Sequence, residues 1–187
     1  MEWRQKCRRK WGDMGGLSKA TFDSFRKLVY EKSGISLGPQ KEALVSARVG
    51  KRMRALHIER HDEYLQYVMN DDSGRELVEM LDAISTNTTS FFREPEHFTL
   101  LSDLITKWKQ QGQYRYRIWC AAASSGEEPY TIAMTLCELL DPRTQDIKIL
   151  ATDISTRVLE QCRLGVYTKD KVQTIPPALR ERYFMFA

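Results

Sequence analysis

The chain has 187 residues, of which 42% are hydrophobic and 29% charged, and its net charge is +4. This length suits one domain or two small ones, and no apolar run approaches the roughly 18 residues that a membrane-spanning helix needs. Four scattered cysteines without a Cys-x-x-Cys pair, together with three histidines, predict no metal site. Because residues 1–16 also lack the apolar core of a secretion signal, we expect a cytoplasmic protein without membrane insertion.

The positive charge is concentrated in residues 1–16, where five basic residues accompany two acidic ones. The rest of the chain is close to neutral, which argues against nucleic-acid binding. Trp3 and Trp11 lie among the basic residues, a composition that suits contact with an acidic surface. The alternative, which we favour, is a disordered leader.

Helical periodicity over residues 17–86 predicts a small bundle of four short helices. Ser18 is the expected N-cap of the first helix, and Gly34 is its expected end. Ser73 and Glu76 have the spacing of a capping box at the start of the fourth helix. The helices are expected at about residues 18–34, 39–57, 62–69 and 73–86.

Residues 87–112 are expected to form a linker loop followed by an amphipathic helix, with Pro95 in its first turn. Over residues 113–187 the pattern becomes strand, helix, strand, helix, which predicts parallel strands joined by helical crossovers. The predicted fold class is therefore α plus α/β, in which a helical bundle precedes the first part of a Rossmann-like parallel sheet.

A candidate nucleotide site follows the two expected strands, where such sheets bind their ligands. Small residues at 121–126 follow the first strand and Asp153 follows the second. The absence of both Gly-x-Gly-x-x-Gly and a P-loop argues against NAD and ATP. Glu127 and Glu128 would repel a phosphate and attract a cation, so S-adenosylmethionine, with its sulfonium and ammonium groups, fits better. The alternatives are that both glutamates only stabilise a helix N-terminus and that Asp153 only caps a helix.

Four stretches of the sequence resemble the CheR family of chemotaxis receptor methyltransferases. They are TNTTSFFRE (86–94), RIWCAAASSGEEPYTIAM (117–134), ILATDIS (149–155) and VLEQCRLGVYTKDKVQTIPPALRERYF (158–184). The resemblance extends over about residues 17–187 and implies a receptor-recognition bundle followed by a class I methyltransferase sheet. It also implies methyl transfer from S-adenosylmethionine to glutamates on acidic chemoreceptor helices, giving glutamate methyl esters and S-adenosylhomocysteine.

The resemblance also implies roles for particular residues. Arg93 is the expected catalytic residue, since a guanidinium can orient a carboxylate through a forked hydrogen bond. The alternative is a structural ion pair with Glu94 or Glu96. The expected cofactor contacts are Asn87, Thr89, Arg93, Ala122, Glu128 and Asp153. The expected substrate-recognition residues are Arg48, Lys51, Arg52 and Arg54, for which a solvated helix face is the alternative.

Phe91 and Phe92 are expected to be packing residues, with at least one of them buried against the sheet. Members of the family have seven strands, and only two are recognisable here. We therefore expect an N-terminal portion of a longer enzyme. The alternative is a non-catalytic receptor-binding or partner-binding protein derived from the family by truncation.

Overall fold

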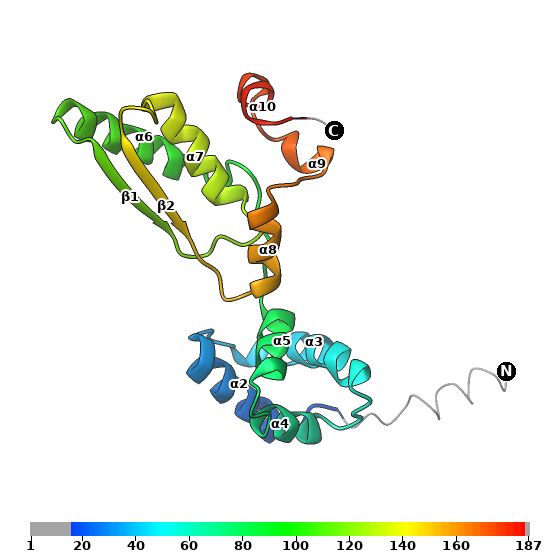
Figure 1. The fold of residues 1–187 in the computed structure, drawn as a ribbon. Helices are drawn as coiled ribbons and strands as arrows, with labels where there is room; N and C mark the ends of the chain where they lie inside the picture. The colour runs from blue at the N-terminus through cyan, green and yellow to red at the C-terminus, as the bar shows by residue number, and fades with distance from the viewer. Residues whose placement is uncertain (1–15, 186–187) are drawn as a thin grey trace. The chain divides into compact units, whose positions relative to one another are not determined.

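The computed structural model describes residues 16–185 and divides into two compact units at Ser85 and Thr86. The first unit is entirely helical where it is described, and the second combines helices with a parallel sheet (Figure 1). The expected fold class, α plus α/β, is thereby confirmed. Most of the basic leader, with both of its tryptophans, lies outside the described residues.

The first unit contains the four expected α-helices. Ser18 caps the first of them by accepting a hydrogen bond from the backbone N–H of Thr21 at 3.1 Å. Gly34 ends it with a left-handed φ of 73°, a conformation that costs glycine little. The elements are α2 (Lys19–Ser33), a 3-10 turn (Pro39–Lys41), α3 (Glu42–Ala55), α4 (His61–Met69) and α5 (Arg75–Ile84).

The helices of this unit surround one apolar core. Each helix contributes residues at a spacing of three or four, which places them on one face. The fully or almost fully buried members include Phe25, Val29, Val45, Val49, Met53, Tyr64 and Met80. This core accounts for the helical pattern that the sequence shows.

The capping box expected at Ser73 and Glu76 is wrong. Gly74, with φ 65°, is the N-cap of α5, and the backbone N–H of Glu76 donates instead to a carboxylate oxygen of Asp71 at 2.8 Å. The Glu76 side chain cannot reach back to the cap because it turns inward, where it is 5% exposed and bound by other helices. Arg52 donates to it through two nitrogens at 3.0 and 2.7 Å, and the Tyr64 hydroxyl donates at 2.7 Å.

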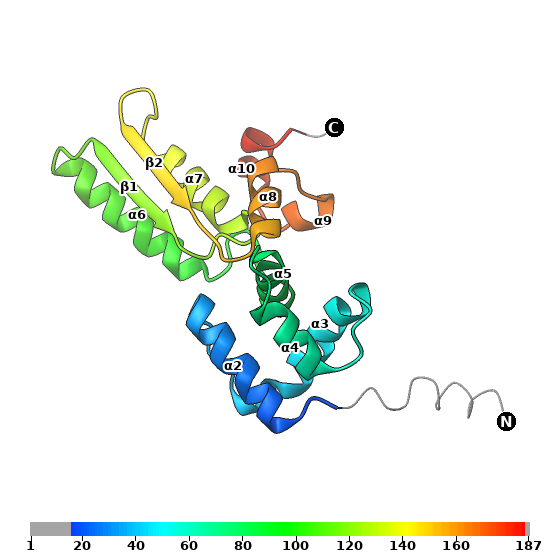
Figure 2. The same cartoon turned by 60° about the horizontal axis from the view of Figure 1, so that its bottom comes forward.

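The second unit contains a two-stranded parallel sheet, β1 (Arg115–Cys120) and β2 (Asp146–Ala151). The strands are in register from Arg115 opposite Asp146 to Cys120 opposite Ala151. Helix α7 (Glu127–Leu139) connects them, as the strand-helix-strand pattern predicts. Helices α6 (Pro95–Gln110) and α7 lie on the same face of the sheet (Figures 1 and 2).

The sheet thus has one covered face and one open face. On the covered face, Tyr116 and Cys120 pack with Ile105 of α6 and with Leu136 of α7. On the open face, alternate residues point to solvent, and Trp119 is 67% exposed. Helix α6, which the sequence places in a linker segment, is therefore an integral part of the second unit.

The chain after β2 continues as α8 (Thr156–Leu164), α9 (Lys169–Val172) and α10 (Pro177–Tyr183). Residues of this tail form a second apolar cluster with Met134 of α7 and with Phe91. Phe91 is 2% exposed, which confirms that one of the two phenylalanines is buried. The expectation that it packs on the sheet is wrong, because its partners are α7 and the tail, including an edge-on contact with the Tyr167 ring at 4.9 Å.

Candidate functional site

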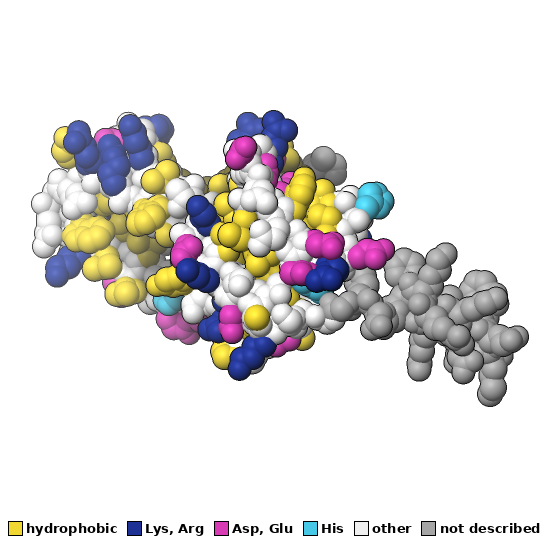
Figure 3. All heavy atoms as spheres, turned by 90° about the horizontal axis from the view of Figure 1, so that it is seen from below, with side chains coloured by type: hydrophobic (Ala, Val, Ile, Leu, Met, Phe, Trp, Pro, Cys, Tyr) yellow, Lys and Arg dark blue, Asp and Glu magenta, His cyan; other side chains and the backbone are white. Residues whose placement is uncertain are grey.

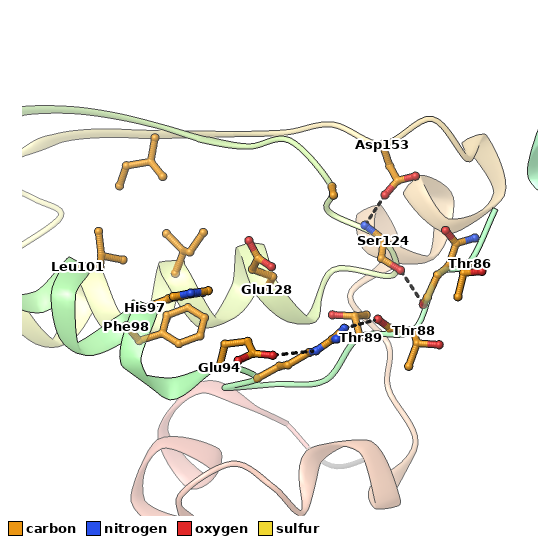
Figure 4. Close-up of a pocket in the computed structure, with 15 residues that line it drawn as sticks. Thr86, Thr88, Thr89, Glu94, His97, Phe98, Leu101, Ser124, Glu128 and Asp153 are labelled. Atoms are coloured by element: carbon orange, nitrogen blue, oxygen red, sulfur yellow. Dashed lines mark hydrogen bonds and ion pairs between the residues drawn. The ribbon is translucent and has the colours of Figure 1, made fainter. Parts of the chain in front are cut away.

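A cavity of about 470 Å³ lies within the second unit, at the carboxyl ends of both strands (Figure 4). This volume is typical of small-molecule sites, and the position is where parallel α/β sheets bind ligands. All six expected cofactor-contacting residues line it. The lining comprises Thr86, Asn87, Thr88, Thr89, Arg93, Glu94, His97, Phe98, Leu101, Ile118, Ala122, Ser124, Glu128, Ile132 and Asp153.

Residues 86–94 form the loop that contributes most of the polar lining. The backbone carbonyl of Asn87 accepts a hydrogen bond from the Ser124 hydroxyl at 2.9 Å, which joins the loop to the turn after β1. The Arg93 guanidinium donates to the carbonyl of Thr88 at 2.9 Å and lies 3.8 Å from the Glu94 carboxylate. Both side chains of this ion pair are exposed, so the pair contributes little stability.

The turn after β1, residues 121–126, contributes the small residues Ala122 and Ser124 to the cavity lining. Ser124 and Gly126 both have positive φ angles, of 48° and 102°. At Gly126 a Cβ atom would collide with the Tyr167 hydroxyl and lie 3.0 Å from the Cys162 sulfur, so only glycine fits. The Tyr167 hydroxyl donates to the carbonyl of Ser125 at 2.8 Å and holds the turn from the tail side.

Asp153 follows β2 and organises the turn beside it. One carboxylate oxygen accepts from the backbone N–H of Ser124 at 2.8 Å (Figure 4). The other accepts from the backbone N–H of Ser155 at 2.9 Å. The N-cap of α8 is Ser155, so the alternative that Asp153 caps this helix is wrong, although Asp153 binds the backbone of the cap residue. A carboxylate has about four lone-pair positions, so two remain for a ligand such as a ribose diol.

The adjacent glutamates at the start of α7 have different surroundings. Glu127 is 1% exposed and lies 2.5 Å from the Lys171 ammonium, while the Ser125 hydroxyl donates to it at 2.7 Å. Glu128 is exposed and directs its carboxylate to the cavity (Figure 4). The geometry therefore favours Glu128 over Glu127 as the group that meets a ligand.

Cys120 is the nearest partner of Glu128. Its thiol lies 3.4 Å from a carboxylate oxygen of Glu128 and donates to it. Burial, followed by the charge and hydrogen bond of Glu128, raises the pKa of the Cys120 thiol to about 12. The thiol is therefore neutral at physiological pH and leaves the negative charge of Glu128 available.

The charge pattern of the cavity suits a cationic adenosine cofactor. Glu94, Glu128 and Asp153 supply three carboxylates against the single guanidinium of Arg93. Within residues 16–185, neither Glu128 nor Asp153 forms a salt bridge. Two carboxylates of opposite walls without a counter-ion fit an ammonium at one end and a ribose at the other, as S-adenosylmethionine presents them.

Several lining residues were not predicted from the sequence. His97, Phe98 and Leu101 come from the first turns of α6, and Ile118 and Ile132 come from β1 and α7. The helical pattern after Pro95 places Phe98 and Leu101 on the apolar face of the helix, and such a face predicts burial in the core and not a ligand site. The one sequence feature that could have indicated His97 is its position, because it lies in the first turn of the helix that directly follows Arg93.

The four basic residues expected on α3 differ in their surroundings. Arg48 donates to the backbone carbonyls of Ile84 and Ser85, the latter at 2.6 Å. Arg52 binds Glu76, whereas Lys51 and Arg54 are exposed. On the face of the bundle seen in Figure 3, basic and acidic side chains alternate and form no continuous basic field.

A second hollow of about 800 Å³ lies between α7, the end of α8 and the tail. It is larger but mainly apolar, and among the described residues that line it only Lys169 is charged. No set of polar groups converges there as in the smaller cavity.

None of the helices formed by residues 16–185 is long and apolar enough to cross a membrane.

A cavity at the carboxyl ends of parallel strands defines the α/β unit as a ligand-binding domain of the parallel-sheet class. Comparison with protein families gives the more specific result. Residues 20–85 match the profile "CheR methyltransferase, all-alpha domain", and residues 87–187 match "CheR methyltransferase, SAM binding domain". The chain belongs to the CheR methyltransferase family, and the cofactor of the matched domain is S-adenosylmethionine.

Curated relatives support this membership. The chain is 39% identical over 168 residues to chemotaxis protein methyltransferase 2 of Pseudomonas aeruginosa, covering 90% of this chain and 59% of the relative. It is 38% identical over 169 residues to the chemotaxis protein methyltransferase of Escherichia coli, covering 90% and 58%. The chain thus spans about three-fifths of the length of the curated relatives that it matches.

Proposed function

We propose that the chain takes part in transferring the methyl group of S-adenosylmethionine to glutamate side chains of chemotaxis receptors. The products are glutamate methyl esters and S-adenosylhomocysteine. The observation that carries the proposal is the pair of carboxylates without counter-ions, Glu128 and Asp153, on one cavity of a SAM-binding domain. The names of the curated relatives support the chemotaxis setting.

The cavity offers a polar group for each part of the cofactor. Asp153 would accept hydrogen bonds from the ribose hydroxyls, and Glu128 would hold the ammonium of the methionine part. Asn87, Thr89 and Arg93 line the wall formed by the loop, and Ala122 adds a small side chain beside them. When bound, S-adenosylmethionine supplies an electrophilic methyl group.

The reaction needs alignment more than proton transfer. A glutamate carboxylate, with an ordinary pKa of about 4.3, is ionised at neutral pH and needs no general base. Arg93 lines the cavity, and we propose that it orients this carboxylate by forked hydrogen bonds. A full salt bridge would reduce the reactivity of the carboxylate, so we assign Arg93 a positioning contact with the substrate.

Receptor recognition is proposed for the basic side of α3. Lys51 and Arg54 are exposed and offer charge to an acidic helix, whereas Arg48 and Arg52 fix α3 to α5 through their internal bonds. The acidic methylation helices of chemoreceptors are the partners that this charge suits. Because S-adenosylmethionine is a metabolite of the cell interior, we place the reaction in the cytoplasm.

The test begins with ligand binding to the 187-residue chain. Calorimetry is expected to detect S-adenosylhomocysteine and neither NADH nor ATP. Asp153→Ala should weaken S-adenosylhomocysteine binding by about 100-fold, because two charged hydrogen bonds to the ribose are lost. The matched control is Asp146→Ala, which removes an aspartate at the opposite end of β2 and should leave the affinity unchanged.

The activity is tested with radiolabelled S-adenosylmethionine and receptor cytoplasmic fragments. Base-labile label on receptor glutamates is the expected result. Binding of NADH in place of S-adenosylhomocysteine, or equal affinity in Asp153→Ala, would overturn the site. Cofactor and receptor binding without any methyl transfer would instead favour the non-catalytic partner-binding function.

A further inference from the structure

Thr131 is a buried residue that connects α7 to the loop carrying Arg93. It has no exposed surface and does not line the cavity. Its hydroxyl donates to the carbonyl of Glu127 at 2.6 Å, one turn earlier in α7. The same oxygen accepts a hydrogen bond from the backbone N–H of Phe92 at 3.2 Å, across 39 residues of sequence. A hydroxyl has one hydrogen to donate and two lone pairs that accept, so Thr131 can make both hydrogen bonds at the same time.

The backbone that Thr131 holds is in an uncommon conformation. Phe92 and Glu94, on either side of Arg93, have positive φ angles of 53° and 55°. Non-glycine residues adopt this region at a cost and keep it only where the surroundings impose it. Contacts with the rest of the unit must therefore hold this segment in place if the Arg93 side chain is to point in one fixed direction.

Side-chain packing supplies some of the anchoring but does not set the peptide plane at Phe92. Phe91 is buried against α7 and the tail, and the Phe92 ring meets the Phe98 ring edge-on at 5.7 Å. Apolar contacts are non-directional, so they do not by themselves orient the N–H of Phe92. The bond from the Phe92 N–H to Thr131 is the polar contact that ties the Phe91–Phe92 peptide to α7, whereas the next N–H, that of Arg93, donates within the loop to the carbonyl of Ser90 at 3.4 Å.

We propose that Thr131 is a positioning residue for methyl transfer, whose hydroxyl sets the backbone of residues 92–94 and thereby the direction of the Arg93 guanidinium. This inference rests on the proposed function, because it concerns the alignment of the substrate carboxylate. Misplacement of an orienting group by about 1 Å can reduce a rate by roughly 100-fold, so an indirect contact of this kind is sufficient to matter.

Thr135 provides a matched control on the same helix. Its hydroxyl donates to the carbonyl of Thr131 at 2.8 Å, the same bond to the preceding turn that Thr131 makes to Glu127. It accepts no hydrogen bond from the loop. Thr131→Val and Thr135→Val therefore remove the same group and the same helical bond, but only the first removes the anchor of Phe92.

The first measurement is amide hydrogen exchange of the 187-residue chain. In Thr131→Val the Phe92 amide should exchange at least tenfold faster than in the unmodified chain, and Thr131→Ser should restore the slow rate. Thr135→Val should leave that amide unchanged. An unchanged Phe92 amide in Thr131→Val, or an equal effect from Thr135→Val, would overturn the proposal.

The second measurement separates positioning from general damage. In Thr131→Val the kcat for receptor methylation should fall by about 10- to 100-fold, while the affinity for S-adenosylhomocysteine changes by less than threefold, because Glu128 and Asp153 are untouched. Equal losses in kcat and affinity would overturn the positioning role. If the unmodified chain neither binds S-adenosylhomocysteine nor transfers methyl groups, the proposed function fails, while the exchange of Phe92 still decides whether Thr131 anchors the loop.

Discussion

The two units differ in whether a key carboxylate has a cationic partner within the chain. In the helical unit, the carboxylate of Glu76 is enclosed and fully engaged by Arg52 and Tyr64. In the α/β unit, Glu128 and Asp153 face a cavity, and no cation within the described residues pairs with them. A carboxylate used for structure is given its counter-ion by the fold, whereas a carboxylate used for binding is left for the ligand to neutralise.

The same contrast occurs between two consecutive residues. Glu127 is buried and forms an ion pair with Lys171, whereas Glu128 lines the cavity, where a ligand could bind it. Helix geometry explains the difference, because successive residues of a helix point about 100° apart. Their identical chemistry therefore supports different roles, and substitutions can distinguish these roles.

The largest expected effect is in the helical unit. Arg52→Met leaves the Glu76 carboxylate in the interior with only the Tyr64 hydroxyl as donor. Breaking an internal ion pair costs about 3–5 kcal/mol, and because Arg52 is 26% exposed we expect about 3 kcal/mol in the free energy of unfolding by urea. Lys51→Met, an exposed neighbour on the same helix, should change that energy by less than about 0.5 kcal/mol. Equal effects of the two substitutions would contradict the structural role assigned to Glu76.

A smaller effect, on binding and not on stability, is expected from Glu128→Gln. The amide keeps the shape of the side chain but loses the charge that attracts an ammonium. We expect the affinity for S-adenosylhomocysteine to fall by about 10- to 100-fold, with an unchanged free energy of unfolding. Calorimetry and urea unfolding on the same preparation measure both quantities. A loss of stability without a loss of affinity would show that Glu128, like Glu127, has a structural role and does not bind the ligand.

The smallest effect concerns alkaline pH. Burial raises the pKa of the Cys120 thiol from 9.0 to about 12, so the folded chain retains a proton that the unfolded chain releases. Its contribution to stability is complete below pH 9 and is lost as the pH rises from 9 toward 12. The midpoint of thermal unfolding should decline more gently over pH 9–11 in Cys120→Ala than in the unmodified chain. An identical decline in both would show that other groups, such as Tyr64 and Tyr167, whose pKa values burial also raises, account for it.

The sequence predicts the elements well because their apolar spacing is local information. The strands and the crossover helix follow from patterns within about ten residues, and so does the position of Asp153 directly after the second strand, whereas the prediction of Glu128 came from the family resemblance. The capping box at Glu76 was wrong because its partners, Arg52 and Tyr64, come from other helices. The burial of Phe91 against the tail, the choice between Glu127 and Glu128, and the anchor at Thr131 depend on contacts between distant segments that no local pattern encodes.

The ties that complete the cavity all join segments far apart in the chain. The bonds from Ser124 to Asn87, Tyr167 to Ser125 and Lys171 to Glu127 span 37, 42 and 44 residues. Contacts of such separation carry a larger loop-closure entropy than the turns of a helix. The formation of the helices alone therefore does not create the cavity, and ligand binding depends on the closure of these long-range contacts across the α/β unit.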